Sequence, residues 1–552
     1  MTTTEPITEQ NHFIPASKRW FKNSLSHSSH FQGLGLPEQD EMFSLYCGQL
    51  VADAMQQQKI IRANFVERPG LPQNIVEKGK AMSNEGKRLL SSPPFEEVDG
   101  SPLEDWITRN WSATAKDTLT IPNTIEDLIH LLRIGYHYAP TLQHQEAHRY
   151  AKYDATNNPF IKQHIEALRT NISHSLPELG MDNTKLLLAK TGSSILPAIL
   201  QTLQFEGRRR LDPTANENFI LSILSDSPYF EAGNAMGAMR PAGAFGSSRL
   251  NFSPPGSQGL SAPMVHTLST ESRAPHLQNV AMSLDDGGIC CFYAEPIGNN
   301  PAMDVPNLRK VIETIKATRK IDSKYQKIFL IIDTSIMGGK FELSKFFSPG
   351  DFENINVVVL ESANKYLSYG ANKGDFGIVY GIGPDTDWLF DSLKSIFQMN
   401  GVPDLHDTLS VPLPDDEIIV ERKKRLNDNT HFLAENINTL FEKKFKIVYP
   451  GLENHPQYQR AKDEYDFQGS VFFVTLPSEE AYGKVEKLLS QSEIIGYGTS
   501  YGFNETRAEV IRRKEEDTGE KKAIGLRVSV GTENIRKLIL VLEEFKRVFE
   551  QV

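Results

Sequence analysis

Val357-Val-Val-Leu-Glu-Ser-Ala-Asn-Lys365-Tyr-Leu-Ser-Tyr-Gly370 is the stretch that best predicts the fold. Four apolar residues end abruptly in small polar residues and a lysine. Such a run is typical of a buried strand in a parallel sheet, and open α/β sheets bind ligands where strands end at their carboxyl edge. Lys365 is therefore a candidate covalent catalyst, because a desolvated, neutral amine can attack a carbonyl carbon. The alternative is a surface lysine just past a strand.

The composition is that of an ordinary soluble globular protein, with 552 residues, 39% apolar and 23% charged. The net charge of −11, with both signs interspersed, indicates neither a nucleic-acid partner nor a membrane surface. The first residues do not resemble a signal peptide, and no apolar run approaches the roughly 18 residues of a membrane span. The chain has three cysteines, of which Cys290 and Cys291 are adjacent. We expect buried free thiols, no metal site and a cytoplasmic protein.

From about residue 184, strand patterns alternate with helix patterns. This alternation predicts an α/β fold with a mainly parallel sheet covered by helices on both faces. The expected helices lie at 195–205 and 304–319. The expected strands lie at 185–190, 219–225, 289–295, 328–333, 356–361 and 375–381.

The pattern changes after about residue 400 and predicts a smaller α+β domain. It contains strands at 469–476 and 524–530 and helices at 414–443, 478–490 and 533–550. The first 145 residues favour an irregular, mostly helical extension without chemistry of its own, with helices at 41–64 and 124–136. We therefore expect an extension at 1–145, a large domain at 146–405 and a small domain at 406–552.

Two loops at the ends of predicted strands carry side chains suited to a phosphorylated ring. Thr191-Gly192-Ser193-Ser194 opens a helix, and the free N–H groups of such a turn bind phosphate. A simple helix cap is the alternative. Asp226-Ser-Pro-Tyr229 follows the next strand, and its tyrosine either stacks on a heteroaromatic ring or packs within a turn.

Polar residues also follow the central strands. Asn300, beside Pro301, can donate to a phenolate-like oxygen or form a simple Asn-Pro turn. Asp333 ends the apolar run that begins at Ile328, and an anion there needs a cationic partner such as a protonated pyridine nitrogen. A helix-capping aspartate is the other interpretation. Lys365 comes 32 residues later, one crossover away, so both side chains are expected at neighbouring strand ends.

Arg527 interrupts an otherwise apolar strand in the small domain. Its planar fork suits a substrate carboxylate, although an internal salt bridge is the alternative. A phosphate seat, a stacking ring, an anion, an amine and this arginine together predict a pyridoxal phosphate (PLP) site that acts on an amino acid.

Seven motifs, in order, make the chain resemble the Cys/Met-metabolism (transsulfuration) family of fold-type I PLP enzymes, which includes cystathionine γ-synthase and methionine γ-lyase. The resemblance covers roughly residues 147–552. In the C-terminal half, 449–456 resembles YPGLxxHP, 500–506 resembles SLGxxET and 527–533 resembles RLSVGxE. Upstream, the similar segments are Tyr150-Ala-Lys152 with Asn158-Pro159 (YxRxxNP), Asp226-x-x-Tyr229 (DxxYGG), Asn300-Pro301 (ETPxNP) and Ser362-Ala-Asn364-Lys365 (SxTK).

The resemblance implies a fold-type I architecture, with a seven-stranded type of sheet, and a role for each matching residue. Lys365 would form the Schiff base with the cofactor, Asp333 would hold its ring nitrogen, and Tyr229 would stack on the ring and assist proton transfer. Asn300 would contact the ring oxygen, and Ser500 and Arg527 would bind the substrate carboxylate. The phosphate would bind Gly192, Ser193, Ser362 and Asn364, helped by Tyr150 and Lys152 from a second subunit of a dimer or dimer of dimers.

The departures from the family pattern lie mainly at the substrate end. Lys152 replaces an arginine, Asn364 replaces a threonine, and Phe230 and Glu231 replace two glycines. Thr499 occupies a position that varies with substrate in the family. A charged stretch around 507–522 stands where the family has a His-Pro and Met-Thr-His segment.

The expected activity is γ-replacement or γ-elimination through a β,γ-unsaturated imine that accepts a sulfur or carbon nucleophile or collapses to a 2-oxo acid. Candidate substrates are O-acyl-homoserines, cystathionine, methionine and S-adenosylmethionine. The alternatives are a PLP-dependent β-lyase or aminotransferase, and a cofactor-free interaction module.

Overall fold

The computed structural model describes most of the chain from residue 159 onward, and the chain divides into two compact units. One unit is Met1–Asp154 with Glu533–Glu544, and the other is Ala155–Thr532 with Phe545–Val552. The described residues are 159–173, 185–211, 221–225, 232, 264–267, 289–319, 327–338, 341–353, 355–370, 376–400, 413–514 and 521–552, with isolated helical positions between Met42 and Lys80. The domain boundaries expected at 145 and 405 stay a prediction.

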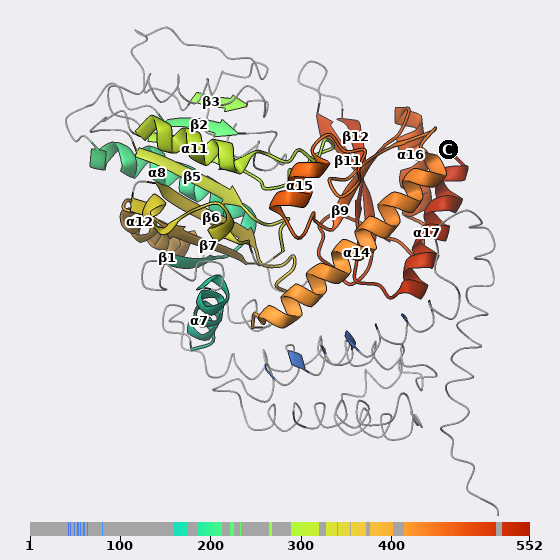
Figure 1. Ribbon diagram of the computed structural model, residues 1–552, viewed down its shortest axis with the longest axis horizontal. Helices are drawn as coiled ribbons and strands as arrows, with labels where there is room; N and C mark the ends of the chain where they lie inside the picture. The colour runs from blue at the N-terminus through green and yellow to red at the C-terminus, as the bar shows by residue number, and fades with distance from the viewer. Residues whose placement is uncertain are drawn as a thin grey trace, which may run out of the picture. The chain divides into compact units, whose positions relative to one another are not determined.

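A seven-stranded sheet forms the centre of the second unit (Figure 1). Its order is β1-β7-β6-β5-β4-β2-β3, and only β7 runs antiparallel to its neighbours. The predicted mainly parallel sheet is therefore confirmed. Its strands are β1 (Lys185–Ala189), β2 (Leu221–Ser225), β3 (Met264–Thr267), β4 (Ile289–Ala294), β5 (Lys327–Asp333), β6 (Asn356–Ser362) and β7 (Gly377–Ile382).

Both faces of this sheet are covered, which explains the continuous apolar runs of its central strands. Helices α8 (Ile195–Leu211) and α12 (Thr386–Asn400) pack on the face that carries Phe329, Ile331 and Val358. The alternate residues, such as Leu330 and Val357, are buried as well. Figure 1 shows α11 (Leu308–Arg319) in front of the sheet and α8 behind it. Helix α7 (Pro159–Ser173) precedes the first strand.

The carboxyl ends of β5 and β6 lie side by side. The two strands pair in parallel, with Asp333 opposite Leu360. Asp333 is the last residue of β5 and Ser362 is the last residue of β6. The prediction that Asp333 and Lys365 belong to neighbouring strand ends is therefore confirmed.

The C-terminal part forms a five-stranded sheet with helices. Its order is β10-β11-β12-β9-β8. These strands are β8 (Lys446–Val448), β9 (Val471–Thr475), β10 (Gly496–Tyr497), β11 (Arg507–Lys514) and β12 (Lys521–Ser529). The helices are α14 (Asp416–Phe441), α15 (Tyr458–Glu464), α16 (Glu479–Leu489) and α17 (Ile535–Glu550). The long helix α14 begins where Asp415 accepts a hydrogen bond from the Ile418 N–H at 3.1 Å, an N-cap followed by two acidic residues.

The charged stretch around 507–522 contains a strand that the sequence analysis did not predict. Strand β11 pairs antiparallel with β12, from Arg507 opposite Ser529 onward. Ala508 and Val510 of β11 are buried. Arg512 forms ion pairs with Glu479 and Glu486 of α16, so tertiary charge pairs stabilise a strand whose own residues are mostly polar.

The N-terminal region is described only at isolated positions. Those between residues 42 and 63 are helical, in agreement with the helix expected at 41–64. The Gln49 side chain accepts a hydrogen bond from the Ile535 N–H at 2.8 Å, at the start of α17. The helix expected at 124–136 lies outside the described residues.

Candidate active site

Lys365 lies in the turn that follows β6, and its half-buried side chain contacts the loop around residue 500. The Nζ atom donates a hydrogen bond of 2.6 Å to the Ser500 Oγ atom. It also lies 4.9 Å from the ring centre of Tyr501, within the range of a cation–π contact. The amine therefore contacts the loop that carries the predicted substrate-binding serine, unlike the alternative of a lysine extended into solvent.

The Ser500 loop is strained and closely packed against the lysine turn. Ser500 has a φ of +78°, in the left-handed region that a side chain disfavours. A Cβ on Gly502 would lie 2.9 Å from the backbone carbon of Lys365, so only glycine fits there. Arg422 fixes the loop from α14, with a 2.7 Å hydrogen bond to Asn504 and a longer one to the Gly502 carbonyl. These contacts hold the Ser500 hydroxyl at the lysine amine.

Asp333 presents a half-buried carboxylate beside Lys365. Its Oδ1 atom accepts from the Ser335 N–H at 2.9 Å, and its Oδ2 atom accepts from the Tyr293 hydroxyl at 3.1 Å. Burial raises the pKa of Asp333, while the hydrogen bonds from Ser335 and Tyr293 and the charge of Lys365 oppose that increase. A cationic ring nitrogen next to this carboxylate would favour its charged form, as the charge of Lys365 does.

Gly192 and Ser362 adjoin each other at the ends of β1 and β6. A Cβ on Gly192 would lie 2.7 Å from the Ser362 Cβ atom and 2.9 Å from its Oγ atom. Gly192–Ser194 form a short 3-10 turn that leads into α8, with Thr191 as its N-cap. Small residues at the start of a helix leave room and N–H groups for a phosphate. The predicted phosphate residues Gly192, Ser193 and Ser362 thus share one corner of the sheet.

Asn364 also belongs to this corner, where it replaces the family's threonine. The Ser362 hydroxyl donates to the Asn364 Oδ1 atom at 2.6 Å. The Ser362 N–H donates to the Ser335 hydroxyl at 3.0 Å, and Ser335 in turn binds Asp333. Ser335 therefore connects the predicted phosphate site to the predicted ring site.

Arg527 is 2% exposed and lies on β12, close to the serine loop. Its Nη2 atom donates to the Thr499 hydroxyl at 2.5 Å and forms a 3.4 Å ion pair with Glu509, its register partner on β11. The salt bridge expected as an alternative is therefore present. Both contacts use Nη2, and the rest of the planar fork can still bind a carboxylate.

Asn300 forms the turn that its sequence suggested. Its Oδ1 atom accepts from the N–H groups of Ala302 and Met303 at 2.9 and 3.0 Å. Because the oxygen is used within the turn, the amide nitrogen is the atom that can donate to a cofactor oxygen.

Three predicted site residues, Tyr150, Lys152 and Tyr229, lie outside the described residues. Sequence reasoning missed Ser335 and Tyr293, which contact Asp333 directly. Ser335 carried a weak signal, since it follows Asp333 by two residues and Asp side chains often bind the N–H two residues on. Tyr293 reaches Asp333 from another strand, so only the sheet register reveals it.

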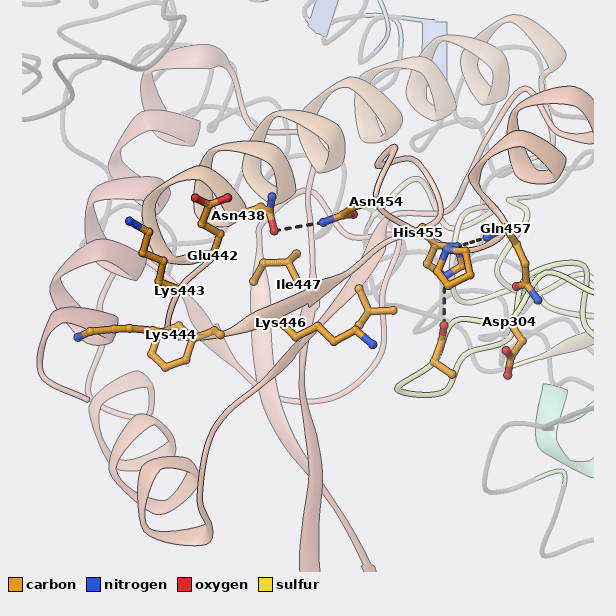
Figure 2. A pocket seen from close by; sticks show the side chains of 14 residues that line it. Asp304, Asn438, Glu442, Lys443, Lys444, Lys446, Ile447, Asn454, His455 and Gln457 are labelled. Carbon is orange, nitrogen blue, oxygen red and sulfur yellow. Dashed lines mark hydrogen bonds between the residues drawn. The ribbon is translucent and has the colours of Figure 1, made fainter.

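A pocket of about 510 Å³ lies elsewhere, beside β8 and the end of α14 (Figure 2). Its residues include Lys443, Lys446 and His455 and none of the predicted site residues. His455 bonds the Ala302 carbonyl through Nε2 and the Gln457 N–H through Nδ1, and burial lowers its pKa. This histidine therefore packs the Pro301–Met303 turn, and the geometry at the strand ends defines the candidate active site.

Comparisons with known proteins find one matching family and several similar solved structures. A family model described as "Cys/Met metabolism PLP-dependent enzyme" matches residues 273–545. The solved structure of cystathionine gamma synthase from Xanthomonas oryzae pv. oryzae has a TM-score of 0.50 at 15% identity, covering 72% of this chain and 87% of its own. The metB structure from Corynebacterium glutamicum gives 0.49 at 17%, with coverages of 72% and 86%. Yeast cystathionine gamma-lyase gives 0.49 at 17%, with coverages of 73% and 88%. A search of curated proteins found no match.

The described residues fit the cofactor that the family uses. Lys365 offers an amine, Asp333 offers a carboxylate that a cationic ring nitrogen would stabilise, and the missing Cβ of Gly192 lets the turn before α8 pack directly against Ser362. The resemblance seen in the sequence and the predicted fold are thereby confirmed. The cofactor-free interaction module considered as an alternative is not supported. The chain resembles the Cys/Met-metabolism family of PLP-dependent enzymes, whose family model matches residues 273–545.

Proposed function

We propose that the chain catalyses γ-elimination or γ-replacement on an amino acid that carries a leaving group at Cγ. One observation carries the proposal: the Lys365 amine, beside the Asp333 carboxylate, donates a 2.6 Å hydrogen bond to Ser500, whose neighbour Thr499 contacts Arg527. These contacts support a site that combines a base, a partner for the cofactor ring and a receptor for the substrate carboxylate.

The cofactor would be held by residues of the large sheet. Asp333 would bind the ring nitrogen, Asn300 the ring oxygen and Lys365 the aldehyde carbon, and Tyr229 would stack on the ring. The phosphate would bind Gly192, Ser193, Ser362 and Asn364. When bound, PLP supplies an electron sink that stabilises the negative charge left after a proton leaves Cα.

Lys365 is the residue placed to move protons. Its Nζ atom takes a proton from Cα only while the amine is uncharged, and it lies 4.9 Å from the ring centre of Tyr501. The Ser500 hydroxyl fixes the position of Nζ. Chemistry at Cγ requires a second proton to leave Cβ, and one base can serve both carbons because they are adjacent.

Arg527 would bind the substrate carboxylate and thereby orient Cα toward Lys365. Its guanidinium is buried, so a bidentate contact with a carboxylate is strong. The 3.4 Å ion pair with Glu509 holds the Arg527 guanidinium in position before the substrate binds.

The substrate candidates are O-acyl-homoserines, cystathionine, methionine and S-adenosylmethionine. The Xanthomonas oryzae protein with the same fold is named a cystathionine gamma synthase, and we propose chemistry of that type here. The segment around 507–522, which includes Glu509 on β11, departs from the family pattern at the substrate end, and S-adenosylmethionine is the candidate that would account for this change.

A homodimer or a dimer of dimers with a shared site is part of the proposal, because Tyr150 and Lys152 match a segment that reaches phosphate across subunits in the family. Mixing Lys365→Ala subunits with Lys152→Ala subunits tests it. Restored activity in the mixture supports sharing, since one of the two mixed sites is intact. Activity that stays absent, with mixed dimers verified by mass, contradicts sharing.

Exchange in deuterated water tests the reaction class. The holoenzyme is incubated with each candidate substrate, and label at Cα and Cβ is followed by mass spectrometry. Label at Cβ together with loss of the Cγ group is expected, because both protons must leave. A β-lyase or aminotransferase would instead give 2-oxo acid without Cγ cleavage, which would overturn the proposal. Lys365→Ala serves as the control and should show no exchange.

Location is a lesser part of the proposal. Among the described residues, no helix is both long and apolar enough to span a membrane. Cys291 is a buried free thiol, as expected. The cytoplasmic location inferred from the composition stays a prediction.

A further inference from the structure

Tyr293 places its hydroxyl between two carboxylates at the edge of the candidate site. It lies on β4 with Ile331 of β5 as its register partner, and Asp333 follows two residues later on the same face. The hydroxyl lies 3.1 Å from the Asp333 Oδ2 atom and 3.1 Å from the Glu295 Oε1 atom. Tyr293 is 2% exposed and Glu295 is 5% exposed, so the contact is shielded from water.

A tyrosine hydroxyl has one hydrogen, and here it has two acceptors. Burial, then the negative charges of Asp333 and Glu295, raise the pKa of Tyr293, so the hydroxyl keeps that hydrogen. The remaining oxygens are engaged by backbone groups. Glu295 Oε2 accepts from the Asn299 N–H at 2.9 Å, and Asp333 Oδ1 accepts from the Ser335 N–H at 2.9 Å. Both carboxylates are therefore fixed in orientation while they compete for a single donor.

Among the described residues, the charged and titratable groups around Asp333 come from the two neighbouring strand ends. Tyr293 and Glu295 come from β4, and Lys365 comes from the turn after β6. Lys365 donates a hydrogen bond to Ser500, and in the proposed reaction it moves protons. Tyr293 and Glu295 can therefore change the proton affinity of Asp333 without contacting the substrate.

We propose that Tyr293 and Glu295 are positioning residues of the cofactor site, and that the division of the Tyr293 hydrogen between Glu295 and Asp333 sets how firmly Asp333 holds the proton it shares with the ring nitrogen. The inference rests on the part of the proposed function that assigns Asp333 to that nitrogen. A stronger hydrogen bond from Tyr293 weakens the hold of Asp333 on the proton. Glu295 counteracts this by drawing the hydroxyl away and by adding negative charge nearby.

Two variants change this balance in opposite directions. Tyr293→Phe removes the donor, so Asp333 holds a proton more firmly. Glu295→Gln keeps the shape, removes the charge and leaves the Tyr293 hydrogen to Asp333, so Asp333 holds a proton less firmly. If Tyr293 and Glu295 had a purely structural role, both variants would show the same kind of defect. The proton affinity of Asp333 would then not shift in opposite directions.

The test compares PLP with its analogue that has carbon in place of the ring nitrogen. Binding of each to cofactor-stripped enzyme is measured from pH 5 to 9, and the ratio of the two affinities reports the shared proton. In the unmodified enzyme the preference for PLP falls at high pH, where that proton is lost. We expect the midpoint of this fall to move up by about one pH unit in Tyr293→Phe and down by about one in Glu295→Gln, the size of one hydrogen bond to a charged group.

The Asp333→Asn variant distinguishes this inference from the assignment of Asp333 to the ring nitrogen. Loss of the pH-dependent preference in Asp333→Asn supports the ring-nitrogen assignment. If that variant behaves as expected while the other two midpoints stay fixed or move together, the inference alone is wrong. If Asp333→Asn retains the full preference, the assignment and the inference both fail. Should Tyr293→Phe not fold, the downward shift in Glu295→Gln decides the matter.

Discussion

Gly192→Ala should separate recognition of the cofactor's phosphate from recognition of its ring. The added Cβ would lie 2.7 Å from the Ser362 Cβ atom and 2.9 Å from its Cα atom, where ordinary contacts begin near 3.4 Å. These atoms cannot rotate away, because one is backbone and the other is the root of a side chain. The turn that begins α8 must therefore move away from the end of β6.

The expected size follows from this overlap. Overpacking of this kind destabilises a fold by about 1–3 kcal/mol. Displacing the turn removes at least one hydrogen bond to a charged phosphate, about 1.5–3 kcal/mol, which corresponds to a loss of about 10- to 100-fold in PLP affinity. Pyridoxal, which lacks the phosphate, should lose much less affinity.

Absorbance titrations of the cofactor-stripped enzyme with PLP and with pyridoxal measure both effects. Gly483→Ala on α16 is the matched control, because its Cβ meets nothing within 4 Å. This control should bind PLP normally and gain up to about 1 kcal/mol of stability from its better helix propensity. Equal losses for PLP and pyridoxal in Gly192→Ala, or no loss at all, would refute the proposed phosphate site.

Three further predictions concern the other side of the site. Arg527→Lys keeps a donor for Thr499 but loses the fork, so the substrate KM should rise about 10- to 100-fold with an unchanged cofactor spectrum; an unchanged KM in steady-state assays contradicts the carboxylate role. Ser500→Ala removes this hydrogen bond from the Lys365 amine, and the rate of Cα exchange measured by NMR should fall about 10-fold, whereas a wild-type rate argues against positioning by this hydroxyl. Burial raises the pKa of Asp333, so the folded, cofactor-free protein binds its proton more tightly than the unfolded chain does. Stability therefore falls as pH rises from about 3.9 through the raised pKa, by about 1.4 kcal/mol for each unit of the increase. Thermal unfolding of Asp333→Asn without cofactor should lack this decline, and a parallel decline in both proteins would be inconsistent with the assignment.

The central strands could be predicted from sequence because burial on both faces leaves a continuous apolar run. Strands β5 and β6 read this way, and their polar ends identified Asp333 and Lys365. Their proximity followed from the single crossover between them. Strand β3 has four residues and carries too little pattern to be recognised. Strand β11 is mostly polar, and its ion pairs to α16 depend on tertiary structure.

The rest of the site depends on distances that the sequence does not contain. Lys365 and Ser500 are 135 positions apart, and the positive φ of Ser500 has no sequence signal because the residue is not glycine. The register between β4 and β5 brings Tyr293 to Asp333. The family motifs located Ser500 and Arg527, whereas the Glu509 ion pair appeared only with the hairpin that carries it.

Reductive trapping tests the central claim most directly. Borohydride treatment of the PLP-loaded enzyme fixes any covalent linkage between the cofactor and an amine, and peptide mass spectrometry then locates it. We expect the pyridoxyl group on Lys365, with none trapped in the Lys365→Ala variant. A pyridoxyl group on another lysine, or equal trapping in both proteins, would contradict the account.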